Sequence, residues 1–479
     1  MPITRPDVSP NAQSRRRSLI IFLGSLTLLG LIAPVANASE LPPAAPGLLA
    51  GVATVDVTHP QRFTPGHPLP LNVKALVLKS GDVIAVMITV DVVAIGEIGP
   101  IGNDYLGKVR AELTKRHGIP PEAVLVNASH CHGVVCPDVD VKTVEAVSRA
   151  LKNLQPVRVG VGVGREDRVS ENRRLRLKNG READVRHAYS LPPDDQVASV
   201  GPIDPEIGIL RLDRLDGKTL AIVYNFACHP IMGTTATADN TADLVGYASR
   251  LIEASFGEPT VALFIQGCAG DINPIRYKDV HQPRDAEPLG NRLGLSVVQA
   301  ARAIRCTSSG PLRVVHETLA VPRADLSEPI AALLAEQARL IKSLKGTSLN
   351  LKTFLELTAK YQLAGEFPSY YSHLYMTEQS HGREHLRKLD ETNRRNLEAY
   401  LHNVLTMEAL TRLQTNLALL RKHQERNLQA GRKPLVVEMI GLRVGDFRLV
   451  TFPGELTVEI GLNVKKSAPA PHTFVAGYT

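Results

Sequence analysis

The stretch VLVNASHCHG (Val124–Gly133) places an apolar run directly before two histidines that flank a cysteine. The run predicts a buried strand. Side chains at positions i and i+2 of a strand point to the same face, so we expect His130 and His132 to project together, with Cys131 turned away. Two imidazoles at a strand end suit a metal ion, or one metal ligand beside an acid–base group. Polar residues that merely cap the strand are the alternative.

Strands and helices alternate on both sides of this stretch, from about residue 51 to residue 305. Residues 71–95 predict a hairpin that turns at Ser80–Asp82, and residues 101–118 predict an amphipathic helix that ends at Gly118. The alternation continues as a helix over 140–156, a strand over 219–230, a helix over 243–257, a strand over 260–274 and a helix over 289–304. This order predicts an α/β fold with a mixed sheet and helices on its faces.

Residues 327–429 differ from their surroundings because they are helical in pattern and rich in Ala, Leu, Lys, Arg and Glu. We expect an inserted helical segment there. It would shape the mouth of a pocket or meet a membrane surface; ordinary core packing is the alternative. The chain returns to strands over 435–455, and no internal repeat is evident in the sequence.

The N-terminus has the pattern of a secretory signal peptide. A basic Ser14–Arg17 segment precedes an apolar run at 19–34, and Ala36–Ala38 forms an A-x-A cleavage site. We therefore expect cleavage after Ala38, a periplasmic or secreted location, and a mature catalytic domain over 39–479. An uncleaved anchor is the alternative.

Composition excludes some partners and leaves others open. The net charge of +7 includes four arginines and one aspartate of the leader, so the mature chain would carry +4. That weakly basic balance, with no Trp and 4% aromatic residues, gives no case for nucleic acid. The five cysteines are an odd number without a CxxC pair, so we expect small buried thiols with at most a single bridge that the sequence does not place.

Other predicted strands also end in residues that bind metals. The segment over 219–230 ends in His229, that over 260–274 ends in Asp271 and Asn273, and the last strand segment ends in Glu455. In α/β sheets the ligand site lies beyond the carboxyl ends of the strands, so these residues and the opening histidines predict a zinc site with an acid–base group beside it. Taken singly, His229 also fits a loop histidine, Glu455 a carboxylate at a helix N-terminus, and the Gly270–Pro274 segment a simple turn.

These segments together resemble the catalytic domain of the neutral and alkaline ceramidases. The resemblance rests on AGVATVDVTHP, ASHCHG, SENRRLRL, DPEIGILRLDRLDGKTLAIVYNFACHP, ADLVGYASRLIE, ALFIQGCAGDINP and LVTFPGELTVEIGL, in the order of the family. It implies a zinc-dependent amidase in which His130, His229 and Glu455 bind zinc. It also implies that His132 hydrogen-bonds the substrate or transition state and that Arg173 helps to bind the substrate.

The chain departs from the family pattern at two places. Asn273 stands where the family carries a serine nucleophile, so we expect a zinc-activated water to attack instead, with Asp271 as candidate base or orienting group. The family's fourth ligand, a tyrosine, is expected just past Thr479, and Tyr478 is not assigned to that role. The HGREH pattern at 381–385 also fits an inverted zinc-protease motif, but Gly382 interrupts the helix that such a motif needs.

We therefore expect an exported zinc hydrolase of an amide, with an N-acyl lipid or related small molecule as substrate. The helical segment 327–429 could make a peripheral contact with a membrane surface. The alternatives are a non-catalytic metal-containing binding protein on the same fold, and an esterase or glycan-directed hydrolase.

Overall fold

The computed structural model describes residues 47–62, 69–185, 191–233, 240–279, 281–282, 284–307, 310–368, 372–431 and 433–479. The expected signal peptide lies outside the described residues. Among those described, no helix combines the length and apolar character needed to cross a bilayer.

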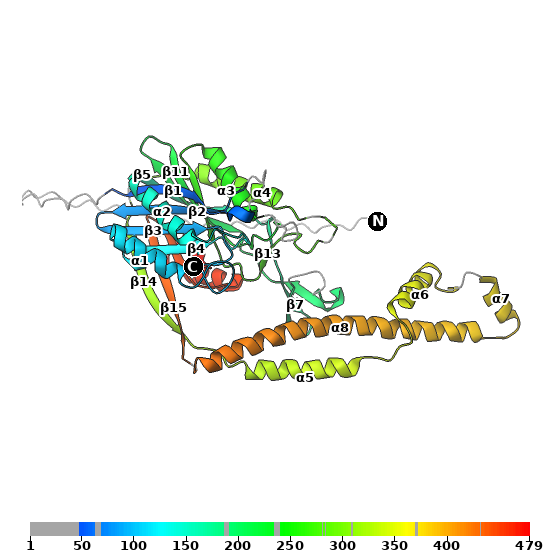
Figure 1. The fold of residues 1–479 in the computed structure, drawn as a ribbon. Helices are drawn as coiled ribbons and strands as arrows, with labels where there is room; N and C mark the ends of the chain where they lie inside the picture. The colour runs from blue at the N-terminus through cyan, green and yellow to red at the C-terminus, as the bar shows by residue number, and fades with distance from the viewer. Residues whose placement is uncertain are drawn as a thin grey trace, which may run out of the picture. The chain divides into compact units, whose positions relative to one another are not determined.

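The fold is built from three units with one order of elements: three antiparallel strands, a helix, and a fourth strand parallel to the third. Figure 1 shows the strands of the first unit, β1 to β4, side by side. The first unit contains β1 (Leu49–Asp56), β2 (Asn72–Ser80), β3 (Val83–Val90), α1 (Tyr105–His117) and β4 (Val124–Ala128), followed by α2 (Val139–Lys152). The second contains β5 (Gln155–Arg165), β10 (Glu206–Arg214), β11 (Thr219–Phe226), α3 (Asp243–Phe256) and β12 (Val261–Gln266), followed by α4 (Glu287–Ala303). The third contains β14 (Leu312–Val321), β15 (Leu435–Val444), β16 (Phe447–Thr451), α9 (Val458–Ser467) and β17 (Thr473–Ala476).

Strand pairing repeats with the units. The first and second strands pair antiparallel, as do the second and third, whereas the third and fourth pair in parallel, in all three units. The first two units join through β1 and β5 into an eight-stranded mixed sheet ordered β12-β11-β10-β5-β1-β2-β3-β4. The third unit forms a separate four-stranded sheet. The three units share the order and pairing of their strands but no evident sequence motif, so the repeat could not be predicted from the sequence.

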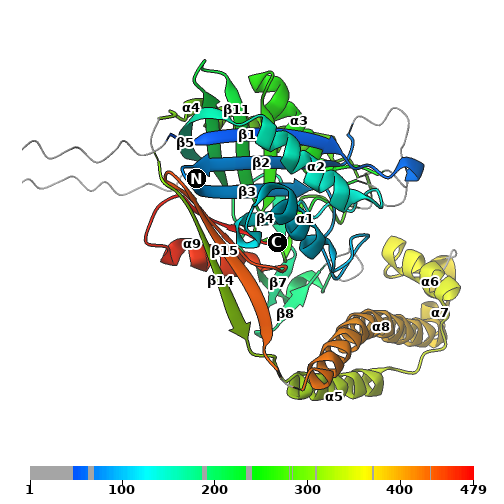
Figure 2. The same ribbon diagram turned by 60° about the vertical axis from the view of Figure 1, so that its left-hand side comes forward.

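The larger excursions of the chain lie between the first and second strands of a unit. In the second unit this excursion carries β6 (Ser170–Asn172), β7 (Arg174–Leu177), β8 (Glu182–Asp184) and β9 (Val197–Val200). In the third unit it carries α5 (Ser327–Ser343), α6 (Leu351–Leu363), α7 (Ser372–Ser380) and α8 (His385–Gln429). Figure 2 shows β14 and β15 leading into and out of these helices.

Alternate residues of the eight-stranded sheet face different cores. Along β2, Val73 and Val77 pack in a cluster with residues of α1 and α2, whereas Leu76 and Leu78 pack with residues of the four-stranded sheet such as Phe447. A third cluster lies between the β10–β12 strands and helices α3 and α4. The predicted mixed sheet with helical cover and a helical insert is confirmed, and the second sheet is an additional layer that the sequence analysis did not foresee.

Local signals account for the ends of several elements. The predicted hairpin turns at Gly81, whose φ of 56° lies in the left-handed region that glycine adopts without strain. The helix α1 ends at Gly118 with φ 66°, whose N–H donates to the carbonyl oxygen of Thr114. Both turns were predicted from the glycines.

Candidate metal centre

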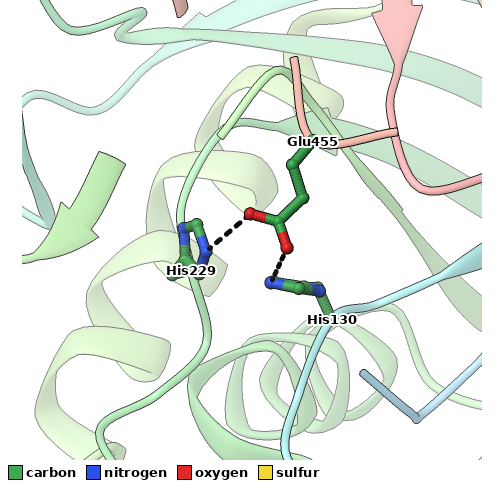
Figure 3. A group of neighbouring side chains, drawn as sticks. All are labelled: His130, His229 and Glu455. Atoms are coloured by element: carbon green, nitrogen blue, oxygen red, sulfur yellow. Dashed lines mark ion pairs between the residues drawn. The ribbon is translucent and has the colours of Figure 1, made fainter. Parts of the chain in front are cut away.

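Three side chains converge where strands of the three units end. The Nε2 atom of His130 lies 3.6 Å from one carboxylate oxygen of Glu455, and the Nε2 atom of His229 lies 3.8 Å from the other. The candidate ligand atoms of the three residues all lie within 4.8 Å of one another. Figure 3 shows the carboxylate between the two imidazole edges. The structure therefore brings together the three residues predicted to bind zinc.

The backbone orients both imidazoles with Nε2 toward the centre. The Nδ1 atom of His130 lies 2.6 Å from the carbonyl oxygen of Val93, and that of His229 lies 2.9 Å from the carbonyl oxygen of Ile272. A carbonyl can only accept, so Nδ1 carries the proton and Nε2 keeps its lone pair. Metal-binding histidines are commonly fixed in this way.

Burial keeps these imidazoles neutral near pH 7. Burial lowers the pKa of His130 to about 4, and it lowers the pKa of His229 well below the usual 6.5, with smaller contributions from the neighbouring positive groups. A neutral imidazole is the form that binds a metal. The pair is therefore prepared to act as ligands without first losing protons.

The three candidate ligands occupy related positions in the topology. His229 and Glu455 follow the third strands β11 and β16, whereas His130 follows the fourth strand β4 by two residues. His130 and His132 face one cavity, as expected, but not because of strand alternation: β4 ends at Ala128 and His130 has a left-handed φ of 69°. This turn, rather than strand alternation, directs His130 toward the centre.

Tyr478 lies beside this cluster, although the sequence analysis did not assign it. Its ring centroid is 4.1 Å from that of His130. Tyr478 is 6% exposed, and its hydroxyl makes no hydrogen bond to the described residues. Burial, together with the charge of Glu455, raises the pKa of the hydroxyl well above its usual value. Tyr478 follows β17 by two residues and has φ 58°, as His130 follows β4 with φ 69°. The position of Tyr478 shortly after an apolar strand, like that of His130, was the signal in the sequence that could have identified it as a site residue.

Buried side-chain amides connect the ends of β4, β12 and β17, the fourth strands of the three units. The side chain of Asn127 donates to the carbonyl oxygen of Gly477 at 2.6 Å and accepts from the backbone N–H of Gln266 at 2.9 Å. The side chain of Gln266 donates to the carbonyl oxygens of Ser129 and Cys228. These bonds satisfy buried polar groups and fix the loops that carry the candidate ligands.

The cluster opens into a cavity of about 610 Å³. All the residues proposed from the sequence line it except Asp271: His130, His132, Arg173, His229, Asn273 and Glu455. The ring of His132 lies 6.2 Å from that of His130, and partial burial lowers its pKa. Partial burial therefore favours the neutral form of His132 in the cavity wall.

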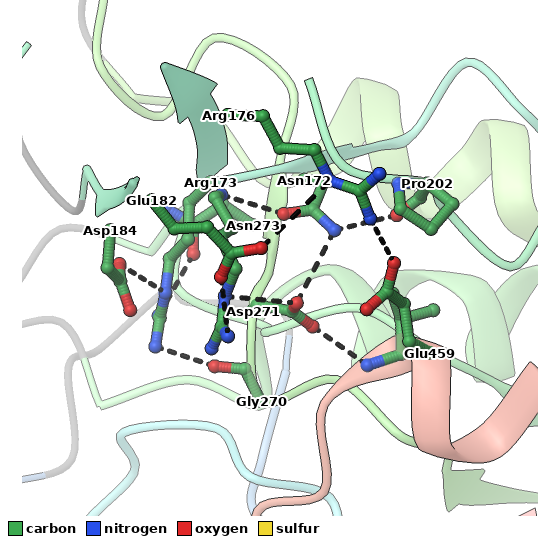
Figure 4. Close-up of polar contacts among 12 residues, drawn as sticks. Asn172, Arg173, Arg176, Glu182, Asp184, Pro202, Gly270, Asp271, Asn273 and Glu459 are labelled. Carbon is green, nitrogen blue, oxygen red and sulfur yellow. Dashed lines mark hydrogen bonds and ion pairs between the residues drawn. The ribbon is translucent and has the colours of Figure 1, made fainter. Parts of the chain in front are cut away.

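Arg173 is fixed against the loop that carries Asn273 (Figure 4). Its guanidinium donates to the carbonyl oxygen of Gly270 at 2.6 Å and to the side-chain oxygen of Asn273 at 3.3 Å, and it forms an ion pair with Asp184 at 3.1 Å. The donated bond orients the amide of Asn273. Its Nδ2 is buried and makes no hydrogen bond to the described residues.

Asp271 is placed behind the cavity. One carboxylate oxygen accepts from the N–H of Val458, the first residue of α9, at 2.8 Å. The other lies 3.4 Å from the side-chain amide of Asn172 and 3.7 Å from Arg174. This is the placement of a helix N-terminal carboxylate rather than of a base facing a substrate. The expected role as base is thus not supported by its position.

The remaining sequence patterns form no site. His381 follows α7 and its Nδ1 lies near the carbonyl oxygen of Thr377, whereas His385 begins α8 and pairs with Glu378. The HGREH residues therefore do not share a helix face. All five cysteines are described and all are free thiols, so the bridge that the sequence allowed is absent.

Comparison with known proteins agrees with this architecture. No protein-family model matches the chain. The solved neutral ceramidase from Pseudomonas aeruginosa is similar, with a TM-score of 0.53 and 17% identity over 90% of this chain and 67% of that one. A structure described as ceramidase complexed with C2 also has a TM-score of 0.53, with 18% identity over 90% of this chain and 68% of that one.

The chain has a neutral ceramidase-like fold. The resemblance drawn from the sequence is confirmed at the level of the fold. At 17–18% identity the ceramidase likeness concerns architecture, so the chemistry of the site has to be argued from its own residues.

Proposed function

We propose that this protein is an exported, zinc-dependent hydrolase that cleaves an amide bond of an N-acyl lipid or a related small molecule. The observation that carries the proposal is the convergence of His130, His229 and Glu455 at the floor of a cavity, with both Nε2 atoms available. Hydrolysis would break the C–N bond. Water would supply a hydroxyl group to the acyl carbon and a proton to the nitrogen, so the products are a carboxylic acid and an amine.

The donor set fits zinc. Two neutral imidazoles and one carboxylate are a common set of three protein ligands in catalytic zinc sites. Tyr478, whose ring lies beside His130 and whose hydroxyl makes no hydrogen bond to the described residues, is the fourth candidate ligand. A zinc ion held there would polarise the scissile carbonyl and lower the pKa of a bound water.

The surrounding residues supply orientation and proton transfer. His132 lies at the cavity wall, where burial favours its neutral form, so it can hydrogen-bond the substrate or accept a proton. Arg173 holds a fixed positive charge there because three partners immobilise its guanidinium. A preorganised charge of this kind stabilises a developing oxyanion.

Asn273 replaces a nucleophile with a hydrogen-bond donor. An amide cannot attack a carbonyl, but Arg173 already occupies the Oδ1 atom of Asn273, which leaves the N–H groups of Nδ2 to donate. We assign Asn273 to binding the carbonyl oxygen of the substrate. This assignment favours water as the nucleophile.

Zinc content tests the proposal first. We would purify the chain from Ser39 onward and measure zinc by elemental analysis, beside His130→Ala, His229→Ala and Glu455→Ala. His117→Ala is the control, because His117 is exposed and bonds Ser148 far from the cluster. The expected result is about one zinc per chain in the native and control proteins and its loss from the three variants.

Turnover is tested on the zinc-loaded protein with short-chain ceramide and simple N-acyl amides. Hydrolysis that stops when a chelator removes the zinc supports the amidase. Bound zinc without turnover on any amide would instead support the binding-protein alternative, and turnover on esters alone would support the esterase.

A further inference from the structure

The cavity above the metal centre carries more positive charge than hydrolysis of a neutral amide requires. Besides Arg173, two arginines line it: Arg62, in the short 3-10 helix Pro60–Arg62, and Arg284, which precedes α4. A bound zinc ion would add two further positive charges. The acidic residues that line the cavity in the described part of the chain are Asp243 and Glu455.

Those two carboxylates are already engaged. Glu455 faces both imidazoles of the metal centre. Asp243 is buried and accepts from the backbone N–H groups of Gly233 and Leu244. Burial raises the pKa of Asp243 to about 6, so its negative charge is only partly developed in weakly acidic solution. Among the described residues, neither carboxylate forms an ion pair with Arg62 or Arg284.

Arg62 and Arg284 differ from Arg173 in their partners. Arg173 pairs with Asp184, whereas neither Arg62 nor Arg284 lies within ion-pair distance of a carboxylate among the described residues. The guanidinium of Arg284 stacks on Tyr277, another lining residue, at 4.2 Å from the ring centroid. Stacking uses the face of the guanidinium and leaves its N–H edge for a ligand.

The guanidinium edge matches carboxylate and phosphate oxygens, which it can bind through two parallel hydrogen bonds. Apolar side chains of Val93, Ile98 and Ile231 also line the cavity, and they suit an acyl chain. The cavity is therefore lined by the candidate metal ligands, by apolar side chains and by two arginines that have no carboxylate partner among the described residues.

We propose that the substrate is an N-acyl amide whose amine part carries an anionic group, a carboxylate or a phosphate, and that Arg62 and Arg284 bind this group. The inference rests on the proposed hydrolase and names the class of its substrate. It makes Arg62 and Arg284 residues that determine specificity, apart from the bond-breaking groups.

Binding of uncleavable ethers tests the inference separately from hydrolysis. Isothermal titration calorimetry on the zinc-loaded protein would compare dodecyloxyacetate, dodecyloxyethyl phosphate and the neutral dodecyloxyethanol, each below its micelle concentration. The variants are the double substitution R62Q/R284Q and the control R292Q, since Arg292 is an exposed residue of α4 that does not line the cavity. Thermal unfolding confirms that each variant is folded.

The native protein and R292Q should bind at least one of the anions about tenfold or more tightly than the alcohol, because a charged hydrogen-bonded contact is typically worth that factor. The preference for the anions over the alcohol should disappear in R62Q/R284Q. Whichever anionic ether binds more tightly to the native protein identifies the anionic group of the substrate as a carboxylate or a phosphate. Equal binding of anions and alcohol, a preference that persists in R62Q/R284Q, or no binding of any ether would overturn the inference. An intact preference without amide hydrolysis would refute the proposed function instead.

Discussion

At the scale of the residue, substitutions of Asn273 test whether its amide binds the substrate carbonyl or merely marks the loss of a nucleophile. Asn273→Asp keeps the shape but removes the Nδ2 donor, so kcat/KM for a cleaved amide should fall about 10²-fold or more, as when an oxyanion donor is lost. Steady-state kinetics on zinc-loaded protein measure this. Asn273→Ser should lower activity as well. A rise in activity with serine would mean that the water-nucleophile assignment is wrong.

Asp91 is a partly buried carboxylate whose effect on stability depends on pH. Burial raises its pKa from 3.8 to about 6, although Lys74 opposes this shift. At pH values between these two pKa values, Asp91 is deprotonated in the unfolded chain but protonated in the folded chain. The contribution of Asp91 to the free energy of unfolding therefore falls as pH rises from about 4 to 6. Asp91→Asn should remove that loss.

Urea unfolding of the native chain and Asp91→Asn between pH 4.5 and 7.5 checks this prediction. The stability of the variant relative to the native chain should increase with pH by on the order of 2 kcal/mol and then level off above pH 6. Asp82→Asn is the matched control, since Asp82 is exposed in the β2–β3 turn. A flat difference for Asp91→Asn would contradict the assignment.

At the scale of the element, α9 depends on Asp271 for its first turn. The carboxylate accepts from the N–H of Val458, and Glu455 lies three residues before that helix. Asp271→Ala should cost about 1–3 kcal/mol of stability, because it leaves a buried donor without its acceptor, and should weaken zinc binding through Glu455. Asp271→Asn retains an acceptor and should cost less.

Chemical unfolding and kcat/KM, measured together, separate this capping role from catalysis. If Asp271 supports α9, activity should fall in step with stability and Asp271→Asn should remain active. Complete loss of turnover in a fully stable Asp271→Asn protein would restore Asp271 as the base.

At the scale of the whole molecule, helices α5–α8 form an excursion between two paired strands. Val321 at the end of β14 lies opposite Leu435 at the start of β15, and no residue of 327–429 lines the described cavity. Replacing 322–434 by a two-residue Asn-Gly turn should therefore preserve the hairpin. We expect a folded protein with about one zinc per chain and unchanged turnover of a short soluble amide.

Elemental analysis and kinetics on this shortened chain check the prediction, with the native chain as reference. Loss of zinc would show that the helices support the sheet. Loss of turnover on long-chain amides alone would assign them to substrate delivery.

Much of the fold could be predicted because its signals are local. The Gly81 turn, the Gly118 helix end and the strand before His130 each depend on a few consecutive residues. His130, His229 and Glu455 were recognisable because ligand-type residues follow apolar strands. Tyr478 was considered but not assigned as a ligand, and Asp271 was expected as a base or orienting group, because an aromatic hydroxyl and a carboxylate acquire their roles from neighbours distant in sequence.

The sequence by itself determined the alternation of strands and helices, the helical insert and the residues that end each strand, since periodicity and turn chemistry act over short distances. Only the tertiary structure decided which strand ends meet. Asn127 bonds residues 139 and 350 positions away, and such contacts bring three topologically alike units to one centre. Burial there makes the histidines neutral, orients Arg173 toward Asn273 and leaves Asp271 to cap α9. These properties arise from desolvation and long-range hydrogen bonds, which local sequence does not contain.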